Sequence, residues 1–310
     1  MRILRVPEYG LLFFISARVR FIVNFENERS AVPAILAEIH LADISPGNGK
    51  DVAAFADRAA EHTNNSICAS GTKISAMKTV VISLGGSILI PTLETNRIRA
   101  YVPVLKNIAA HHRLLVVVGG GGEARRYIEM MRAVGTDEGT SDEIGILITR
   151  LNATLLIAAL GDAAYPVVAE SHAEAKEFAE SGKIVVMGGI TPGQTTDAVA
   201  AVLAERVGAS VFINLTSVDG IYTGDPKKDK GATRFEEMKP KKLLEVVGGT
   251  ALGAGSNNVL DIVAARIVER SNIPLVVLDG SRPDNLSNAI LEGKFKGTIV
   301  SESGENPFPL

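Results

Sequence analysis

The fold is decided by the stretch Leu114-Leu-Val-Val-Val-Gly-Gly-Gly-Gly122, in which an apolar, β-branched run passes directly into glycines. Such a run is typical of a strand buried on both faces of a sheet, and a helical pattern follows it from about residue 123. Runs of the same character recur along the chain, at residues 79–84, 183–187, 211–215 and 274–278.

Helical patterns fill the intervals between these runs, at about residues 94–111, 123–134, 141–161, 171–181, 196–207, 240–248 and 257–271. Regular alternation of strand and helix predicts an α/β fold, a three-layer sandwich with a mainly parallel central sheet covered by helices on both faces. Ligands of such sheets gather at the carboxyl ends of the strands, so the loops that follow the strands are the candidate binding segments.

Composition excludes several other classes. The 310 residues carry 32 Lys and Arg against 35 Asp and Glu, a net charge of −3, and Trp is absent. Because that balance gives no basic field and little stacking surface, we expect no nucleic-acid partner. Cys68 is the single cysteine, which excludes an internal disulfide and a multi-cysteine metal site and favours a cytoplasmic setting. No window reaches the roughly eighteen uninterrupted apolar residues of a membrane span, so we expect no membrane partner.

Residues 1–76 differ from the rest of the chain, because they show few alternations of strand and helix and end in a polar stretch at 61–73. Met77 is the first methionine after Met1, and the strong pattern begins directly after it. We therefore interpret 1–76 as an N-terminal extension, a mis-called start or a poorly ordered segment, and 77–310 as the working domain. A small accessory domain in 1–76 is the alternative.

Two glycine loops follow the first two strands, Gly85-Gly86-Ser87 and Gly119-Gly120-Gly121-Gly122. Between a strand and a helix, glycines let successive backbone N–H groups converge on anionic oxygen, and the helix dipole assists. Gly-Gly also makes ordinary turns, but two such loops together can hold two phosphate groups. The P-loop pattern is absent and the dinucleotide spacing is not matched, so these loops are of another design.

Two further loops are candidates for binding. The stretch 188–197 joins a strand to a helix with Thr196 or Asp197 at a natural cap position, so it is either a helix cap alone or a holder of a second phosphorylated or carboxylated substrate. The stretch 215–228 is rich in turn residues, and it is either a solvated loop or a cover in which Tyr222 lies over a flat base.

The order of these motifs over about residues 77–300 resembles that of the amino acid kinase superfamily, and of its archaeal-type uridylate (UMP) kinase branch. The resemblance rests on Gly85-Gly86-Ser87, Val118-Gly119-Gly120-Gly121, Ala124-Arg125-Arg126-Tyr127, the helix that begins Ile144-Gly-Ile-Leu, Thr195-Thr196-Asp197-Ala198 and Val218-Asp219-Gly220-Ile221-Tyr222-Thr223-Gly224-Asp225-Pro226. It implies transfer of the γ-phosphoryl group of ATP to UMP, giving UDP for pyrimidine and CTP biosynthesis.

The resemblance also implies an acceptor part at about 77–205, an ATP part at about 206–300, and roles for single residues. ATP-binding residues are expected at Gly85, Gly86, Ser87, Gly120, Arg125, Thr216, Tyr222 and Asp225. UMP-binding residues are expected at Gly119, Asp142, Ile190, Thr191, Pro192, Gly193, Gln194, Thr195 and Thr196. Asp142 suits a ribose hydroxyl, although an acid near a helix start is also favoured by the dipole alone.

Phosphoryl transfer needs positioning and charge neutralisation rather than a covalent nucleophile. Mg²⁺ carried by the nucleotide supplies part of the positive charge, and we expect no protein metal site. Relatives commonly have a lysine two residues before the first Gly-Gly pair, where this chain has Ser83. Lys227 or Lys228 is the expected substitute, with Asp197 orienting the lysine that reaches the phosphates, although a solvated lysine pair is the alternative.

Two other interpretations remain open. In the first, the chain is a kinase of the same superfamily whose acceptor is acetylglutamate, another amino acid carboxylate or isopentenyl phosphate. In the second, it is a noncatalytic nucleotide-binding module, which Ser83 would suit. All five histidines lie outside the motifs, which gives no support to a His-based hydrolase or metal site. The helix at 142–160 is apolar over much of its circumference, which fits core burial or a subunit interface, and the resemblance implies a homohexamer built from dimers.

Overall fold

The computed structural model describes residues 2–6, 11–15, 77–224, 229–248 and 259–310. Its contacts divide the chain into two units, Met1–Ile74 and Ser75–Leu310. In the first unit, β1 (Arg2–Val6) pairs antiparallel with β2 (Leu11–Ile15). The interpretation of 1–76 as an extension falls mostly outside the described residues and stays a prediction.

The second unit is built on a seven-stranded sheet with the order β5-β4-β3-β6-β8-β9-β7. In chain order its strands are β3 (Thr79–Leu84), β4 (Arg113–Val118), β5 (Val185–Met187), β6 (Val211–Thr216), β7 (Glu237–Met238), β8 (Leu275–Asp279) and β9 (Gly297–Val300). Neighbouring strands are parallel, except that β8 and β9 pair antiparallel. The apolar runs therefore predicted five of these strands, β3, β4, β5, β6 and β8, and missed β7 and β9.

The two faces of the sheet carry separate apolar cores. Along β3, Val80, Ile82 and Leu84 pack into one core and Val81 packs into the other, as the alternation of side chains along a strand requires. Ser83 shares the face of Val81, and its register partner on β6 is Asn214. Two polar side chains thus lie side by side on an otherwise apolar face, near the carboxyl ends of their strands.

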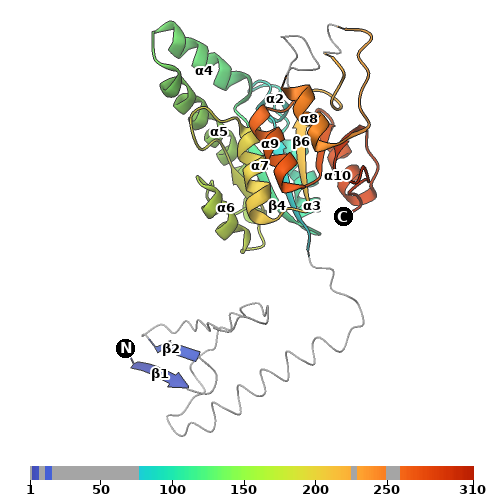
Figure 1. The fold of residues 1–310 in the computed structure, drawn as a ribbon. Coiled ribbons are helices and arrows are strands. Elements are labelled where there is room, and N and C mark those ends of the chain that lie inside the picture. Colours follow the sequence, from blue (N-terminus) through green and yellow to red (C-terminus); the bar gives the residue numbers. More distant parts are fainter. Residues whose placement is uncertain (1, 7–10, 16–76, 225–228, 249–258) are drawn as a thin grey trace. The chain divides into compact units, whose positions relative to one another are not determined.

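Helices cover both faces, which confirms the predicted three layers (Figure 1). The first core is completed by α3 (Ile98–Ala109), α5 (Glu138–Leu160) and α10 (Pro283–Glu292). The second core is completed by α6 (His172–Ala179), α7 (Thr196–Val207), α8 (Pro240–Val247) and α9 (Ile262–Ser271). The remaining helices are α2 (Gly86–Leu89), α4 (Gly121–Ala133), which packs on α5, and the 3-10 turn η2 (Gly161–Ala163).

Several helix boundaries differ from the predicted ones because of capping residues. Asp137 caps α5 by accepting a hydrogen bond from the Thr140 N–H at 3.0 Å, so the helix begins three residues earlier than expected. Asp261 caps α9, which begins at Ile262 rather than near residue 257. The sequence patterns missed α10, although Pro283 in its first turn and Gly293 just after its end, with φ +70°, are standard boundary signals.

The segment Glu138–Ala163, with a mean hydropathy of 1.8, has the length and composition of a membrane span. In this domain, however, α5 buries Ala153, Leu156 and Leu160 in the first core. Leu147 and Leu151 on the same helix are exposed. Helix α5 is therefore apolar over much of its circumference, as predicted. One apolar face packs against the sheet, and another is exposed in the single chain.

Candidate active site

The candidate site lies where β3 and β4 end. The Gly119 N–H donates to the Leu84 carbonyl at 3.0 Å, and the Gly85 N–H donates to the Leu215 carbonyl at 3.3 Å. These bonds place both glycine loops at the carboxyl edge of the sheet, where the sequence predicted them to be. Ser87, in the short helix α2, is exposed there.

The two loops contact each other through their backbones. A Cβ atom on Gly86 would lie 2.1 Å from the Gly121 nitrogen, and one on Gly119 would lie 2.6 Å from the Gly86 nitrogen. Gly121 also has φ +70°, a left-handed conformation that favours glycine. Glycine is therefore needed at these positions because any side chain would keep the two loops apart. The joined loops lead into α4, whose first N–H groups have no acceptor within the helix and suit an anion.

Helix α5 holds the second glycine loop from behind. The buried Asn152 amide donates to the carbonyls of Gly119, at 3.0 Å, and Gly120, at 3.3 Å. One turn earlier, the Thr149 hydroxyl accepts a hydrogen bond from the Gly189 N–H at 2.7 Å. One helix thus fixes both the second glycine loop and the start of the predicted acceptor loop. Asn152 and Thr149 were not predicted as site residues, because a polar residue on a helix by itself indicates a solvated position.

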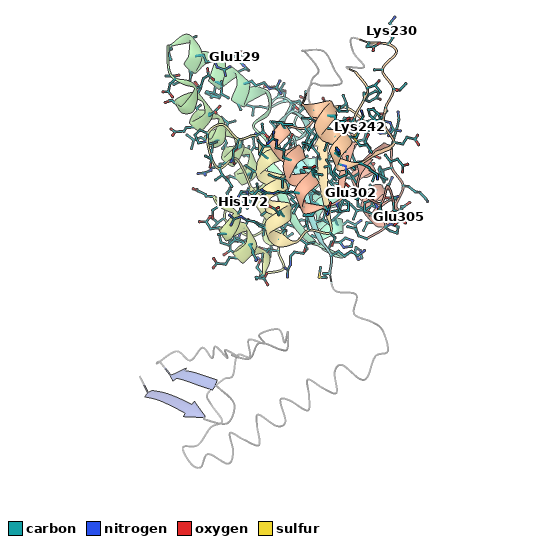
Figure 2. The ribbon with its side chains drawn as sticks, in the orientation of Figure 1. Glu129, His172, Lys230, Lys242, Glu302 and Glu305 are labelled. Atoms are coloured by element: carbon teal, nitrogen blue, oxygen red, sulfur yellow. The ribbon has the colours of Figure 1, made fainter. Side chains whose placement is uncertain are left out.

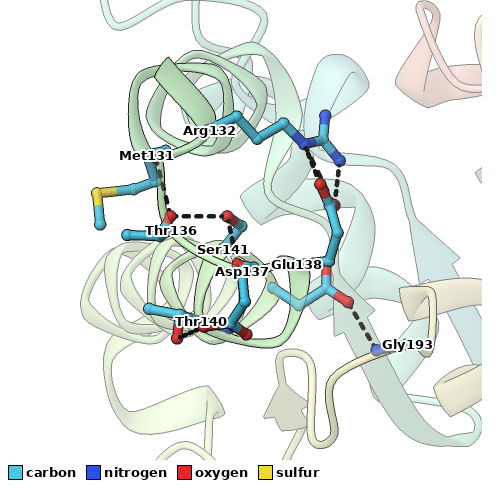
Figure 3. Close-up of polar contacts among 9 residues, drawn as sticks. Met131, Arg132, Thr136, Asp137, Glu138, Thr140, Ser141 and Gly193 are labelled. Atoms are coloured by element: carbon cyan, nitrogen blue, oxygen red, sulfur yellow. Dashed lines mark hydrogen bonds and ion pairs between the residues drawn. The ribbon is translucent and has the colours of Figure 1, made fainter. Parts of the chain in front are cut away.

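The start of α5 also contacts the acceptor loop. Figure 3 shows this region, in which Gly193 of the loop approaches the first turns of α5. The Gly193 N–H donates to one carboxylate oxygen of Asp142 at 2.7 Å. Asp142 is partly buried, and its other oxygen has no hydrogen bond within the described residues. One oxygen shapes the loop, and the second is free for the predicted contact with a ribose hydroxyl.

A cavity of about 250 Å³ lies between the second glycine loop, α5 and the acceptor loop. Gly120, Ile128 and Ile146 contribute to its walls. The predicted UMP-binding residues that line it are Asp142, Thr191, Gln194, Thr195 and Thr196. Gly119, Ile190, Pro192 and Gly193 belong to the same segments but not to the wall. The structure therefore brings most of the predicted acceptor side chains around one space beside a predicted ATP-binding glycine.

The helix after the acceptor loop places an acid close to this cavity. The N-cap of α7 is Thr195, whose hydroxyl accepts from the Ala198 N–H at 3.1 Å, one residue before the predicted cap. Asp197 therefore lies in the first turn and points to the sheet, where the Ser83 hydroxyl donates to it at 2.7 Å. Burial raises the pKa of Asp197 to about 6, and the Asp261 carboxylate also raises it, against hydrogen bonds from Ser83 and Asn214.

The structure describes only some residues of the segment predicted to bind ATP, about 206–300. Thr216 ends β6, and its carbonyl accepts from the Gly280 N–H at 2.9 Å. The Tyr222 hydroxyl donates to Asp219 at 2.6 Å, and Lys296 pairs with the same carboxylate. Arg125 is exposed on α4 and has no ion pair among the described residues. Asp225, Lys227 and Lys228 lie outside the described residues, so their roles stay predictions.

None of the histidines among the described residues lines the cavity beside the glycine loops. His172 is on α6, with Nε2 3.0 Å from the Val199 carbonyl oxygen. Figure 2 labels His172 on α6 together with Glu129 on α4 and Lys242 on α8, and the partly buried ring of His172 faces α7. These positions agree with the absence of histidine from the predicted site.

The comparisons with known proteins agree with this geometry. The profile of the Amino acid kinase family matches residues 78–279. The uridylate kinase of Methanoregula boonei is 70% identical over 234 residues, 76% of this chain and 100% of that protein. The uridylate kinase of Methanoculleus marisnigri is 62% identical over 233 residues, 75% of this chain and 100% of that protein. The crystal structure of uridylate kinase from Archaeoglobus fulgidus superposes with a TM-score of 0.66 at 44% identity, covering 73% of this chain and 100% of that one.

These matches span the unit that contains the glycine loops, the cavity and Asp197. They confirm the family that the order of the motifs predicted. The chain belongs to the amino acid kinase family.

Proposed function

We propose that this chain transfers the γ-phosphoryl group of Mg-ATP to UMP, giving ADP and UDP. An oxygen of the UMP phosphate attacks the γ-phosphorus, the bond from that phosphorus to the ADP oxygen breaks, and ADP leaves with the electron pair. The observation that carries the proposal is the 70% identity to a uridylate kinase along that protein's whole length. The cavity supports it, because it joins the predicted acceptor residues to Gly120.

On the donor side, the phosphates of ATP lie against the joined loops and the start of α4. The backbone N–H groups of Gly86 and Gly120 and the hydroxyl of Ser87 offer donors there, whereas the N–H of Gly85 is bonded to the Leu215 carbonyl and shapes the turn. Arg125 adds a cation that no carboxylate in the described residues neutralises. Thr216, Tyr222 and Asp225 hold the adenosine end. The joined glycine loops give a fixed set of dipoles, and fixed dipoles stabilise the spreading charge of the transferred group most effectively.

On the acceptor side, the cavity takes UMP. The free oxygen of Asp142 accepts from a ribose hydroxyl, and the loop from Ile190 to Thr196 surrounds the phosphate and the base. Asp197 stands between this loop and the sheet, where it orients Lys227 or Lys228 toward the phosphates. Two anions then lie end to end with a cation between them, which is the arrangement that in-line transfer requires.

Incubation of the full chain with Mg-ATP and each acceptor tests the proposal, with nucleotides separated by anion-exchange chromatography. We expect UDP and ADP in equal amounts with UMP, and no phosphorylated product with acetylglutamate or isopentenyl phosphate. Turnover of either other acceptor at a rate above that of UMP would replace the proposed substrate. Binding of ATP and UMP without UDP formation would establish a noncatalytic module.

The exposed face of α5 supports assembly into the homohexamer expected for this family. Leu147, Leu151 and Leu155 recur every four residues, and they are 58%, 53% and 39% exposed in the single chain. Such a stripe costs hydration free energy unless another copy covers it. Light scattering at micromolar concentration is expected to give an oligomer, and Leu151→Glu to reduce its mass. A monomeric wild-type chain would refute the assembly. The reaction would supply UDP to pyrimidine and CTP biosynthesis in the cytoplasm.

A further inference from the structure

Asp261 connects two helix starts that belong to different parts of the domain. One of its oxygens accepts from the N–H groups of Val263, at 2.7 Å, and Ala264, at 3.0 Å, and so caps α9. Its other oxygen accepts from the hydroxyl of Thr195, the residue that caps α7. Asp261 comes from the predicted ATP part and Thr195 from the acceptor loop, and the two helices pack against each other. The carboxylate therefore ties the caps of both helices together.

The single proton of the Thr195 hydroxyl is committed by this contact. The oxygen of that hydroxyl accepts from the Ala198 N–H, and its proton goes to Asp261. A phosphate in the cavity can receive the backbone N–H of Thr195, but it cannot receive the hydroxyl proton while the contact with Asp261 persists. The hydroxyl thus serves the placement of the loop, although Thr195 lines the cavity.

A second hydrogen bond fixes the chain just before α9. The Asn214 amide, on β6, donates to the Val259 carbonyl at 2.9 Å. Asn214 also hydrogen bonds to Asp197, in the first turn of α7. The start of α9 is therefore held from the sheet by Asn214 and holds the acceptor loop through Asp261. Both hydrogen bonds, from Asn214 to Val259 and from Thr195 to Asp261, involve residues that lie close to Asp197.

We propose that Asp261 is a positioning residue for phosphoryl transfer, which aligns the acceptor loop with the ATP part by holding the Thr195 hydroxyl. The inference rests on the proposed kinase activity. Two substrates bound to different parts of a domain react only when those parts are aligned, and a misplacement of about 1 Å costs on the order of a hundredfold in rate. Loss of the tie should therefore lower kcat while each substrate still binds to its own part.

The test compares Asp261→Ser and Asp261→Asn with the wild-type full chain. Serine still caps α9 with its one oxygen but has none left for Thr195, so we expect kcat to fall at least tenfold, with KM for UMP and ATP within about threefold. Asparagine caps α9 equally well and turns its amide toward the Thr195 oxygen, so we expect it to restore most of kcat. Asp137→Ser, the same change at the cap of α5, is the matched control and should leave kcat unchanged.

Thr195→Val removes the contact from the other end, together with the α7 cap that the same hydroxyl makes, so it applies even if Asp261→Ser does not fold. It should lower kcat at least as far, and Asp261→Ser should lower kcat no further in the Thr195→Val background. Wild-type kcat in Asp261→Ser or in Thr195→Val, or losses that add in the double variant, would overturn the inference. An inactive wild-type chain would instead overturn the proposed function, so the two failures are distinguishable.

Discussion

Replacement of Asp197 by asparagine should stabilise the fold and impair the reaction. The pKa of Asp197 rises from an ordinary value of 3.8 to about 6, so the folded state holds the proton more tightly than the unfolded state. The cost of ionisation is absent below pH 3.8, grows between pH 3.8 and 6, and is complete above pH 6. Since each tenfold difference in proton affinity is worth about 1.4 kcal/mol, the full cost is up to about 3 kcal/mol.

Asparagine removes the charge and keeps the oxygen that accepts from Ser83. It also removes the repulsion between the charge of Asp197 and the Asp261 carboxylate. At pH 7.5 we expect the melting temperature of Asp197→Asn to exceed that of the wild type by roughly 5–10 °C. At pH 4.5 the ionisation of Asp197 costs the wild type only about 1 kcal/mol. The difference in melting temperature should therefore shrink to about a third of its value at pH 7.5.

Differential scanning calorimetry of both chains from pH 4.5 to 7.5 checks this, with a coupled ADP-release assay on the same samples. Asp284→Asn, which removes an exposed acid from the first turn of α10, is the control and should change the melting temperature little at either pH. A variant that is less stable than wild type at pH 7.5, or a difference independent of pH, would refute the electrostatic argument. Turnover should fall far more than UMP binding weakens, and unchanged turnover would remove Asp197 from the mechanism.

Other predictions concern the loops and the chain start. Asn152→Ala leaves two buried carbonyls without their donor, so we expect a loss of about 1–3 kcal/mol in a urea melt and a lower kcat/KM for ATP; unchanged values would show that the loop holds itself. Lys227→Ala and Lys228→Ala, assayed separately, should reveal one lysine whose loss lowers kcat at least tenfold, about 1.4 kcal/mol of barrier; two unaffected variants would refute the lysine proposal. Mass spectrometry of the native protein should find a chain that begins at Met77, and a mass matching all 310 residues would refute the mis-called start.

The sequence predicted those parts of the fold and site that depend on local pattern. The central strands were predictable because they are buried on both faces and consist of β-branched runs, as in β4. The acceptor loop was predictable because its cap and turn residues follow a strand. By contrast, β9 has only four residues, with glycine first, and gives too little pattern to distinguish it from a loop.

The residues that hold the site together were not predictable from local pattern. Asn152 is polar on a helix, which by itself indicates a solvated position, and only the packing of α5 behind Gly119 reveals its two acceptors. Asp261 was hidden because the predicted helix began near residue 257 and so placed it inside the helix rather than at its cap. These contacts join residues 33 and 66 positions apart in the chain, and no spacing rule covers such distances.

The charge balance around Asp197 connects stability to the proposed chemistry. The charge that acts on it within the described residues is the like charge of Asp261, and Ser83 and Asn214 offer only neutral hydrogen bonds. Ser83 stands where the resemblance to the superfamily predicts lysine, so among the described residues Asp197 has no opposite charge that would lower its pKa. A cation bound with the nucleotide, or the side chain of Lys227 or Lys228, would offset the free energy of up to about 3 kcal/mol that the ionisation of Asp197 costs the fold without ligands. We therefore expect the site to be least stable when empty and most stable when both phosphates and their cations are in place, which would favour the complete complex over either half.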